Sequence, residues 1–171
     1  YIVNSKTGER IKTLYGYSFV SDFSEGLARV ESNGKWGYID TKGETVIVAG
    51  LYEAARNFSE GLAPVRFNGK WRFIDKSNNE NIDDESYYWL KDLRYEDAYS
   101  FNEGLAAVKH NNKWGFINKS GLVIDYKYED TFSFNEGLAA AKLNGKWGFI
   151  NKEDKVVIPF EFEKAKSFSN G

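Results

Sequence analysis

An octet built around a tryptophan occurs four times in this chain and constrains its fold more than any other feature. The octet reads NGKWGYID at 33–40, NGKWRFID at 68–75, NNKWGFIN at 111–118 and NGKWGFIN at 144–151. Each copy follows the segment EGLA, whose four occurrences begin 35, 43 and 33 residues apart. A period of this size is typical of tandem-repeat proteins, in which each unit folds only against its neighbours.

A second element recurs five times: a tyrosine or phenylalanine, a small residue three positions on, and a phenylalanine three positions after that. A turn-like segment such as FSEG or FNEG follows each copy. The spacing predicts a bend or one turn of 3₁₀ helix rather than a regular strand. The copies are Tyr17/Val20/Phe23, Tyr52/Ala55/Phe58, Tyr95/Ala98/Phe101, Tyr128/Thr131/Phe134 and Phe162/Ala165/Phe168.

The Asn-Gly pair that opens the octet predicts a two-residue β-hairpin, because both turn positions need a positive φ. A turn at 33–34 places Val30 opposite Gly37, and side chains then alternate between two faces. One face is small and apolar, and we expect it to pack on a neighbouring repeat that the glycine allows to approach closely. This face comprises Ala28/Val30/Gly37/Ile39, Ala63/Val65/Arg72/Ile74, Ala106/Val108/Gly115/Ile117 and Ala139/Ala141/Gly148/Ile150.

The tryptophans belong to the other face of the predicted hairpins. Trp36, Trp71, Trp114 and Trp147 lie opposite Glu31, Arg66, Lys109 and Lys142 in this register. The rings are structural if the stems of the three cations cover them, or they form a ladder on which sugars stack. Their solvent exposure discriminates between the two interpretations.

A polar turn and a run of valine and isoleucine complete each unit, at 46–48, 122–124 and 156–158. We therefore predict an all-β fold of tandem three-stranded meanders in an open β-solenoid or superhelix. A small closed five-bladed β-propeller is the alternative, since the element with aromatic and small residues three apart occurs five times. The chain is predicted to be a single array over 1–171. Its units are 1–22, 23–57, 58–100, 101–133, 134–167 and 168–171, of which the first and last are partial.

The repeated motifs resemble those of the WG repeat (KWG repeat) family of bacterial tandem-repeat proteins. The likeness rests on F-S-E-G-L-A at 23–28 and 58–63, F-N-E-G-L-A at 101–106 and 134–139, and K-W-G at 35–37, 113–115 and 146–148. It covers almost the whole chain. The resemblance implies an all-β repeat module, often joined to other domains, and it implies no catalytic residues.

One unit departs from this pattern. Arg72 stands where the other units have Gly37, Gly115 and Gly148, and the same unit carries an insertion at 76–97. Inserted loops of repeat arrays often lie on the binding face, so Tyr87, Tyr88 and Trp89 are candidate contact residues. Alternatively, the insertion forms a local element that covers the gap opened by Arg72.

No residue pattern points to catalysis or to a metal or cofactor site. The single histidine, His110, lies beside a predicted turn, and the glutamates of the EGLA segments recur because the turn does. The chain has no cysteine, and three adjacent acids at 83–85 lack the alternating spacing of a calcium loop. A net charge of -2 argues against a nucleic-acid ligand, and no apolar run is long enough to span a membrane.

The sequence therefore predicts a non-enzymatic structural or protein-interaction module that contacts a protein partner or a second copy. A glycan- or cell-surface-binding module that uses the aromatic rings is one alternative, and an accessory domain of an enzyme is another. The compartment is left open, with an extracellular or cell-surface place favoured.

Overall fold

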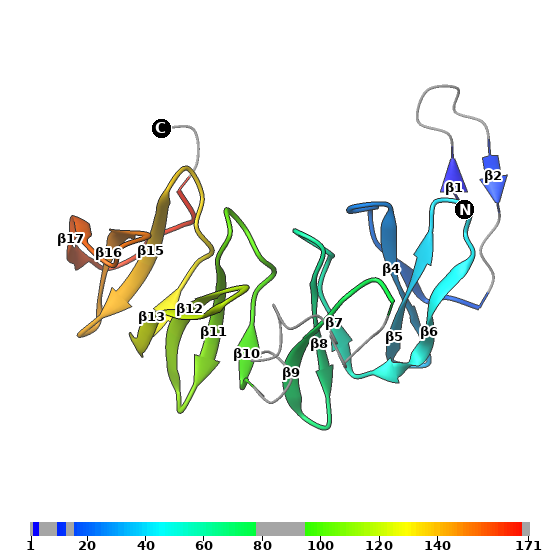
Figure 1. Cartoon of the computed structure of the whole chain (residues 1–171), viewed down its shortest axis with the longest axis horizontal. Helices are drawn as coiled ribbons and strands as arrows, with labels where there is room; N and C mark the ends of the chain where they lie inside the picture. Colours follow the sequence, from blue (N-terminus) through cyan, green and yellow to red (C-terminus); the bar gives the residue numbers. More distant parts are fainter. Residues whose placement is uncertain (1, 4–9, 13–15, 78–94, 169–171) are drawn as a thin grey trace.

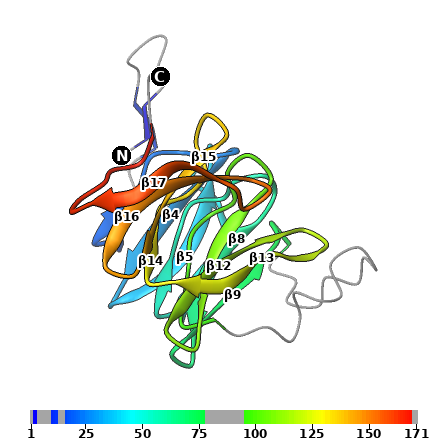
Figure 2. The same cartoon turned by 90° about the vertical axis from the view of Figure 1, so that its left-hand side faces the viewer.

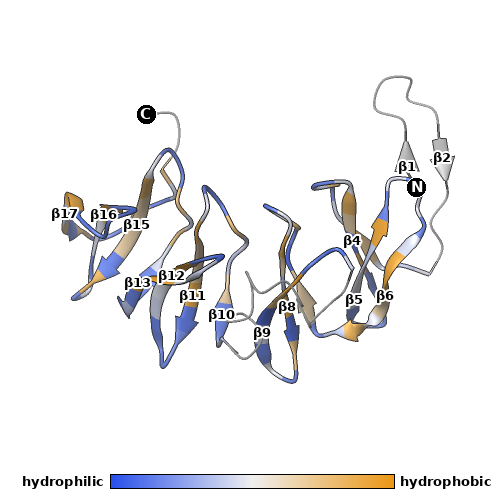
Figure 3. Cartoon of the chain, in the orientation of Figure 1, coloured by the Kyte–Doolittle hydropathy of each residue, from blue (hydrophilic) through white to orange (hydrophobic). Residues whose placement is uncertain are grey.

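The computed structural model of the chain describes residues 2–3, 10–12, 16–77 and 95–168, and in these residues it contains strands and no helix. The strands form antiparallel sheets that follow one another in chain order along the longest axis, and none closes into a barrel (Figure 1). Viewed along this row, the strands of successive sheets overlap (Figure 2). Hydrophobic residues lie mainly on strands and hydrophilic residues at turns (Figure 3). The prediction of an all-β fold is confirmed.

Each sheet is a meander whose neighbouring strands are also neighbours in sequence. A short pair, β1 (Ile2–Val3) and β2 (Arg10–Lys12), precedes the main sheets. The first sheet contains β3 (Phe19–Val20), β4 (Leu27–Ser32), β5 (Lys35–Asp40) and β6 (Thr45–Tyr52). The second contains β7 (Ala54–Ala55), β8 (Ala63–Phe67) and β9 (Lys70–Ile74). The third contains β10 (Asp97–Ala98), β11 (Ala106–His110), β12 (Lys113–Asn118) and β13 (Gly121–Tyr128). The fourth contains β14 (Asp130–Thr131), β15 (Leu138–Leu143), β16 (Lys146–Asn151) and β17 (Val156–Phe162).

The element with aromatic and small residues three apart contains the predicted bend, at Glu53, Glu96 and Glu129, but the residues on either side of the bend pair as strands rather than forming a 3₁₀ turn. Its first residue ends the last strand of one sheet, as Tyr52 does, and Ala55 belongs to the two-residue strand that opens the next sheet. The prediction of three strands per unit was therefore one strand short for the first, third and fourth sheets. The short strand pairs with the hairpin strand beside it, as in the pair Ala55–Val65.

The hairpins have the predicted register in all four units. Glu31 lies opposite Trp36 and Val30 opposite Gly37 in the first sheet, and the other hairpins repeat this pairing. Asn33 and Gly34 have φ values of 52° and 73°, which is the left-handed conformation that an Asn-Gly turn supplies at little cost.

The sheets stack face to face, and the small faces of the second, third and fourth hairpins pack on the sheet before them. Trp71 and Phe73 of the second sheet belong to one buried cluster with Ala106, Val108 and Ile117 of the third. The same pattern joins the third sheet to the fourth. Burial of the small face is thus confirmed. The aromatic face of the first three sheets is buried as well, because the following sheet covers it.

The glycine of the WG pair has a different role from the one its sequence position suggested. A Cβ built on Gly37 would overlap the backbone oxygen of Ile47, in the neighbouring strand β6 of the same sheet. The register shifts between Trp36 and Tyr38, so a β-bulge brings the two backbones together there. The close neighbour is therefore a strand of the same sheet rather than a neighbouring repeat. At Arg72 the segment corresponding to this strand falls within 78–94, outside the described residues.

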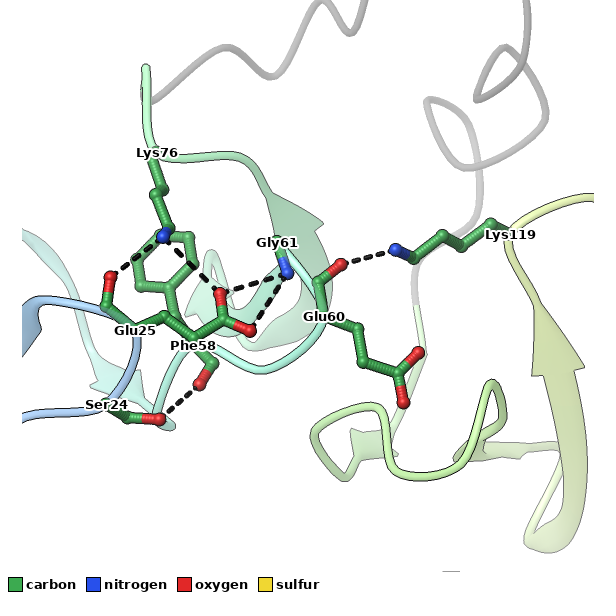
Figure 4. A network of polar contacts seen from close by, with 7 residues as sticks. All are labelled: Ser24, Glu25, Phe58, Glu60, Gly61, Lys76 and Lys119. Carbon is green, nitrogen blue, oxygen red and sulfur yellow. Dashed lines mark hydrogen bonds and ion pairs between the residues drawn. The ribbon is translucent and has the colours of Figure 1, made fainter.

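A repeated polar clamp joins successive sheets at the Glu-Gly turns (Figure 4). The carboxylate of Glu25 accepts a hydrogen bond from the backbone N–H of Gly61 at 3.1 Å, and Lys76 donates to the Glu25 carbonyl at 2.8 Å. Glu60 repeats the arrangement with Gly104 and Lys119. These glutamates have positive φ, with Glu25 at 51°, where asparagine or glycine is the usual residue. The bonds to the next sheet explain why glutamate occupies the position.

Candidate functional site

The repeated tryptophans are largely covered by protein. Trp71, Trp114 and Trp147 are 9%, 4% and 8% exposed, and Trp36 is half-buried. A row of exposed indoles is thus absent from the described chain, and this burial favours the structural interpretation of the rings.

The groups over the indoles differ from those expected. The guanidinium of Arg56 lies 5.0 Å from the centroid of Trp71, and Tyr99 stacks on Trp114 at 5.2 Å with an interplanar angle of 8°. Phe132 takes the same place beside Trp147. Each covering residue lies fifteen positions before its tryptophan, on or next to the short first strand. The cross-strand cations Arg66, Lys109 and Lys142 have the predicted pairing but are not seen over the rings in the described chain.

The remaining predicted contact residues lie in the insertion. Tyr87, Tyr88 and Trp89 fall outside the described residues, so their part in binding stays a prediction. His110 is exposed at the end of β11, with its ring 5.3 Å from that of Tyr126. In the described part of the chain, no three histidine, cysteine, aspartate or glutamate side chains are grouped to hold a metal ion.

A groove of about 510 Å³ crosses several sheets at the edge formed by the short first strands. The groove was not among the sites predicted from the sequence. We call it the inter-sheet groove. Its lining residues are Ser24, Arg29, Arg56, Asn57, Phe58, Ser59, Tyr99, Ser100, Phe101, Asn102 and Ser133.

The polar side chains of the groove recur because they flank the buried phenylalanine of each unit. Phe58 and Phe101 are each 1% exposed, so they anchor the loop in the core. Asn57 and Ser59 lie on either side of Phe58, and Ser100 and Asn102 flank Phe101 in the same way. The groove thus has one pair of small polar residues for each of these two sheets.

Hydrogen bonds between sheets fix the spacing of these polar pairs. Ser100 donates through its hydroxyl to the carbonyl of Asn57 at 2.8 Å, and Ser24 donates to the carbonyl of Phe58 at 2.7 Å. The side chains of Asn57, Ser59 and Ser133 make no hydrogen bond within the part of the chain that the structure describes. They are therefore free to bond to a ligand.

Two arginines give the groove its charge. Arg29 is half-buried, donates to the carbonyl of Ala55 at 2.7 Å and lies 5.4 Å from the centroid of Trp36. Arg56 forms an ion pair with Asp97 at 3.0 Å and lies 4.5 Å from the centroid of Tyr99. Burial lowers the pKa of Arg29, and the nearby charge of Arg56 lowers it further while Tyr38 raises it.

Each arginine occurs at its position in one unit alone. This difference between units is the signal in the sequence that could have identified the groove. The position of Arg29 is occupied by Pro64, Ala107 and Ala140 in the other hairpins. The position of Arg56, directly after the short strand, is occupied by Ser21, Tyr99 and Phe132 in the other units. A comparison of the positions that vary between otherwise similar units would have indicated both residues.

The stacked antiparallel sheets define the class of this chain as an all-β tandem-repeat protein. The sequence profile of the "WG containing repeat" matches residues 15–36, 36–71, 89–114, 114–147 and 147–171. The chain therefore belongs to the WG repeat family, as the motifs indicated. No curated protein matches the sequence.

The solved structures to which the chain is similar include two at low sequence identity. KlHsv2 with loop 6CD replaced by a Gly-Ser linker is 7% identical, with a TM-score of 0.49, over 79% of this chain and 48% of that chain. A plant lectin with two metal binding sites, from Cicer arietinum, is 11% identical, with a TM-score of 0.34, over 90% of this chain and 92% of that chain. The chain thus spans about half the length of the first of these structures.

No helix among the described residues is long and apolar enough to cross a membrane.

Proposed function

We propose that this chain is a non-enzymatic β-repeat module that binds a protein partner through the inter-sheet groove. The supporting observation is where the repeat-specific residues lie. Residues that recur in most units serve the fold: Gly37 permits the bulge within its sheet, and the turn glutamates join neighbouring sheets. Arg29 and Arg56 are specific to their units and line the same groove.

The dimensions and chemistry of the groove suit binding rather than catalysis. It is lined by small polar side chains and two cations, and it crosses several sheets, as the binding surfaces of extended repeat proteins do. Hydrogen bonds between sheets hold its sides in place, so a ligand meets a largely preformed surface.

A selection from a random-peptide display library tests this proposal. Peptides selected on the wild-type chain should lose binding to Ser133→Trp, which fills the groove with an indole. They should keep binding to Ser32→Trp, a matched change at the hairpin end of β4, away from the groove. Thermal unfolding of both variants checks that they are folded. Selected peptides that bind Ser133→Trp as well as the wild type would place the binding surface elsewhere.

We also propose that the array is an open superhelix rather than a closed five-bladed propeller. The first and fourth sheets lie at opposite ends of the row (Figure 1), which supports an open arrangement. Small-angle scattering should give an elongated particle, and the compact profile of a ring would contradict the proposal.

A further inference from the structure

Arg29 is a half-buried cation that lacks a carboxylate partner within the described residues. Its Nη1 donates to the carbonyl of Ala55, and its buried Nε has no hydrogen-bond partner in the described chain. Taking a guanidinium out of water is unfavourable unless an anion and further hydrogen bonds compensate. The described residues supply a carbonyl and the face of Trp36 to Arg29, but no carboxylate in ion-pair contact.

Arg56 adds a second positive charge to the same groove. Nη2 of Arg56 donates to the carboxylate of Asp97 at 3.0 Å. The Nε of Arg56 is also buried without a hydrogen-bond partner in the described chain. Arg56 lowers the pKa of Arg29, after burial as the larger cause, so the two guanidiniums are close enough to repel each other. Asp97 thus pairs with Arg56, while Arg29 has no ion-pair partner among the described residues, and a ligand carboxylate would supply one.

We propose that the inter-sheet groove binds an extended acidic protein segment, with an aspartate or glutamate carboxylate held by Arg29 and Arg56. This inference rests on the proposed function and names the chemistry of the partner. Planar guanidinium groups match carboxylates through paired hydrogen bonds, which gives direction as well as charge. The free side chains of Asn57, Ser59 and Ser133 then bond to the polar groups of the segment.

The aromatic rings of the groove favour a peptide over a sugar. Phe58 and Phe101 are 1% exposed. Tyr99 has the Arg56 guanidinium over its ring at 4.5 Å and stacks in parallel with Trp114 at 5.2 Å. A sugar would have to displace one of these two contacts in order to stack on the ring of Tyr99.

The spacing of the polar pairs suits an extended peptide that runs across the sheets. Stacked sheets lie about 10 Å apart, and an extended chain advances about 3.3 Å per residue. Every third residue of the segment therefore meets the next pair of small polar side chains. An acidic residue at the arginine end, with small residues at the two positions between successive contacts, satisfies this arrangement.

Two synthetic peptides test the inference on the full chain. The probe is the blocked peptide (Glu-Ser-Gly)₄, and its uncharged match is (Gln-Ser-Gly)₄. Calorimetry or fluorescence anisotropy gives the dissociation constants at low and physiological salt. The wild type should bind the glutamate peptide at least about tenfold more tightly than the glutamine peptide, because loss of one partner of a bonded charge pair has an effect of this size or larger.

The variants locate the binding site. Arg29→Gln and Arg56→Gln should each weaken binding of the glutamate peptide by about tenfold or more, and Arg29→Lys should weaken it less. Arg66→Gln removes the same charge from an exposed residue outside the groove and should change binding by less than about twofold. Unfolding curves identify any variant that fails to fold, and the other arginine then decides the result.

The outcomes separate this inference from the proposed function. Equal binding of the two peptides, or equal losses in Arg29→Gln and Arg66→Gln, overturns the acidic-segment inference. Tighter binding of oligogalacturonate than of the glutamate peptide also overturns it, because the ligand is then an acidic glycan. Library peptides that carry no acid yet depend on Ser133 would leave the groove as the binding site while rejecting the acidic ligand.

Discussion

Glu103 provides a direct test of the clamp that joins neighbouring sheets. Its carboxylate accepts the backbone N–H of Gly137 at 3.0 Å and pairs with Lys152 at 3.1 Å. Gly137 and Lys152 both belong to the fourth sheet's unit, so the side chain connects two repeats. The Glu103 side chain is 27% exposed, which means that solvent weakens but does not abolish these contacts.

The expected loss on Glu103→Ala follows from these contacts. A hydrogen bond to a charged group contributes about 1.5–3 kcal/mol to stability, and a half-exposed ion pair contributes about 0–1 kcal/mol. Because the freed N–H of Gly137 regains water, we take about 2 kcal/mol as the net loss, within the range for such bonds. For a domain of this size that corresponds to a fall in Tm of about 4–8 °C.

Thermal unfolding followed by circular dichroism measures this change. Glu103→Gln keeps the shape of the side chain and an acceptor oxygen, so it should lose about half as much, roughly 1 kcal/mol. Glu153→Gln removes the same charge at an exposed turn and should leave Tm within about 1 °C. Equal Tm values for Glu103→Ala and wild type would show that the clamp does not stabilise the array.

The same contacts predict a dependence on pH. Partial burial raises the pKa of the Glu103 carboxyl, but the bonds from Lys152 and Gly137 outweigh it, so the pKa lies below the ordinary 4.5. The stabilisation is therefore complete above about pH 4.5 and is lost as pH falls through the pKa of the folded state. The Tm difference between wild type and Glu103→Gln should shrink over that range. A difference that stays constant down to about pH 3 would contradict this assignment.

Two further predictions concern the bulge glycine and the buried tyrosines. Gly115→Ala should destabilise the chain by about 1–3 kcal/mol, because the Cβ of the new alanine would lie 2.5 Å from the carbonyl oxygen of Ile124. Urea unfolding measures the loss of stability, and an unchanged midpoint would refute the bulge explanation. Burial raises the pKa of Tyr38, Tyr95 and Tyr128 above the usual 10. Since these tyrosines ionise near pH 10 only when unfolded, stability should fall above that pH, and absorbance should show their ionisation together with unfolding. Ionisation of all tyrosines near pH 10 in the folded chain would contradict this.

Local rules were sufficient to predict the hairpins residue by residue. Asn-Gly turns fix the register, so the pairing of Val30 with Gly37 follows from the order of the residues alone. The alternation of side chains then identified the small face as buried. These predictions succeeded because they depend on neighbours in sequence.

The features missed by sequence analysis depend on contacts between units. Alternation distinguishes two faces but does not say whether the second face meets solvent or another sheet. The indole of Trp114 is covered by Tyr99, which follows the short first strand of the same sheet. The Gly37 contact requires a bulge whose position the pattern does not give. The groove forms only where loops from several sheets come together.

The thermal stability of Trp114→Leu tests the central claim that the repeated tryptophans hold the sheets together. Trp114 is 4% exposed and contacts both Tyr99 and the core between the third and fourth sheets. Replacing a buried ring of this size by a smaller side chain should cost about 2–4 kcal/mol and lower Tm by roughly 4–16 °C. An unchanged Tm, together with loss of ligand binding, would show that the ring serves recognition instead.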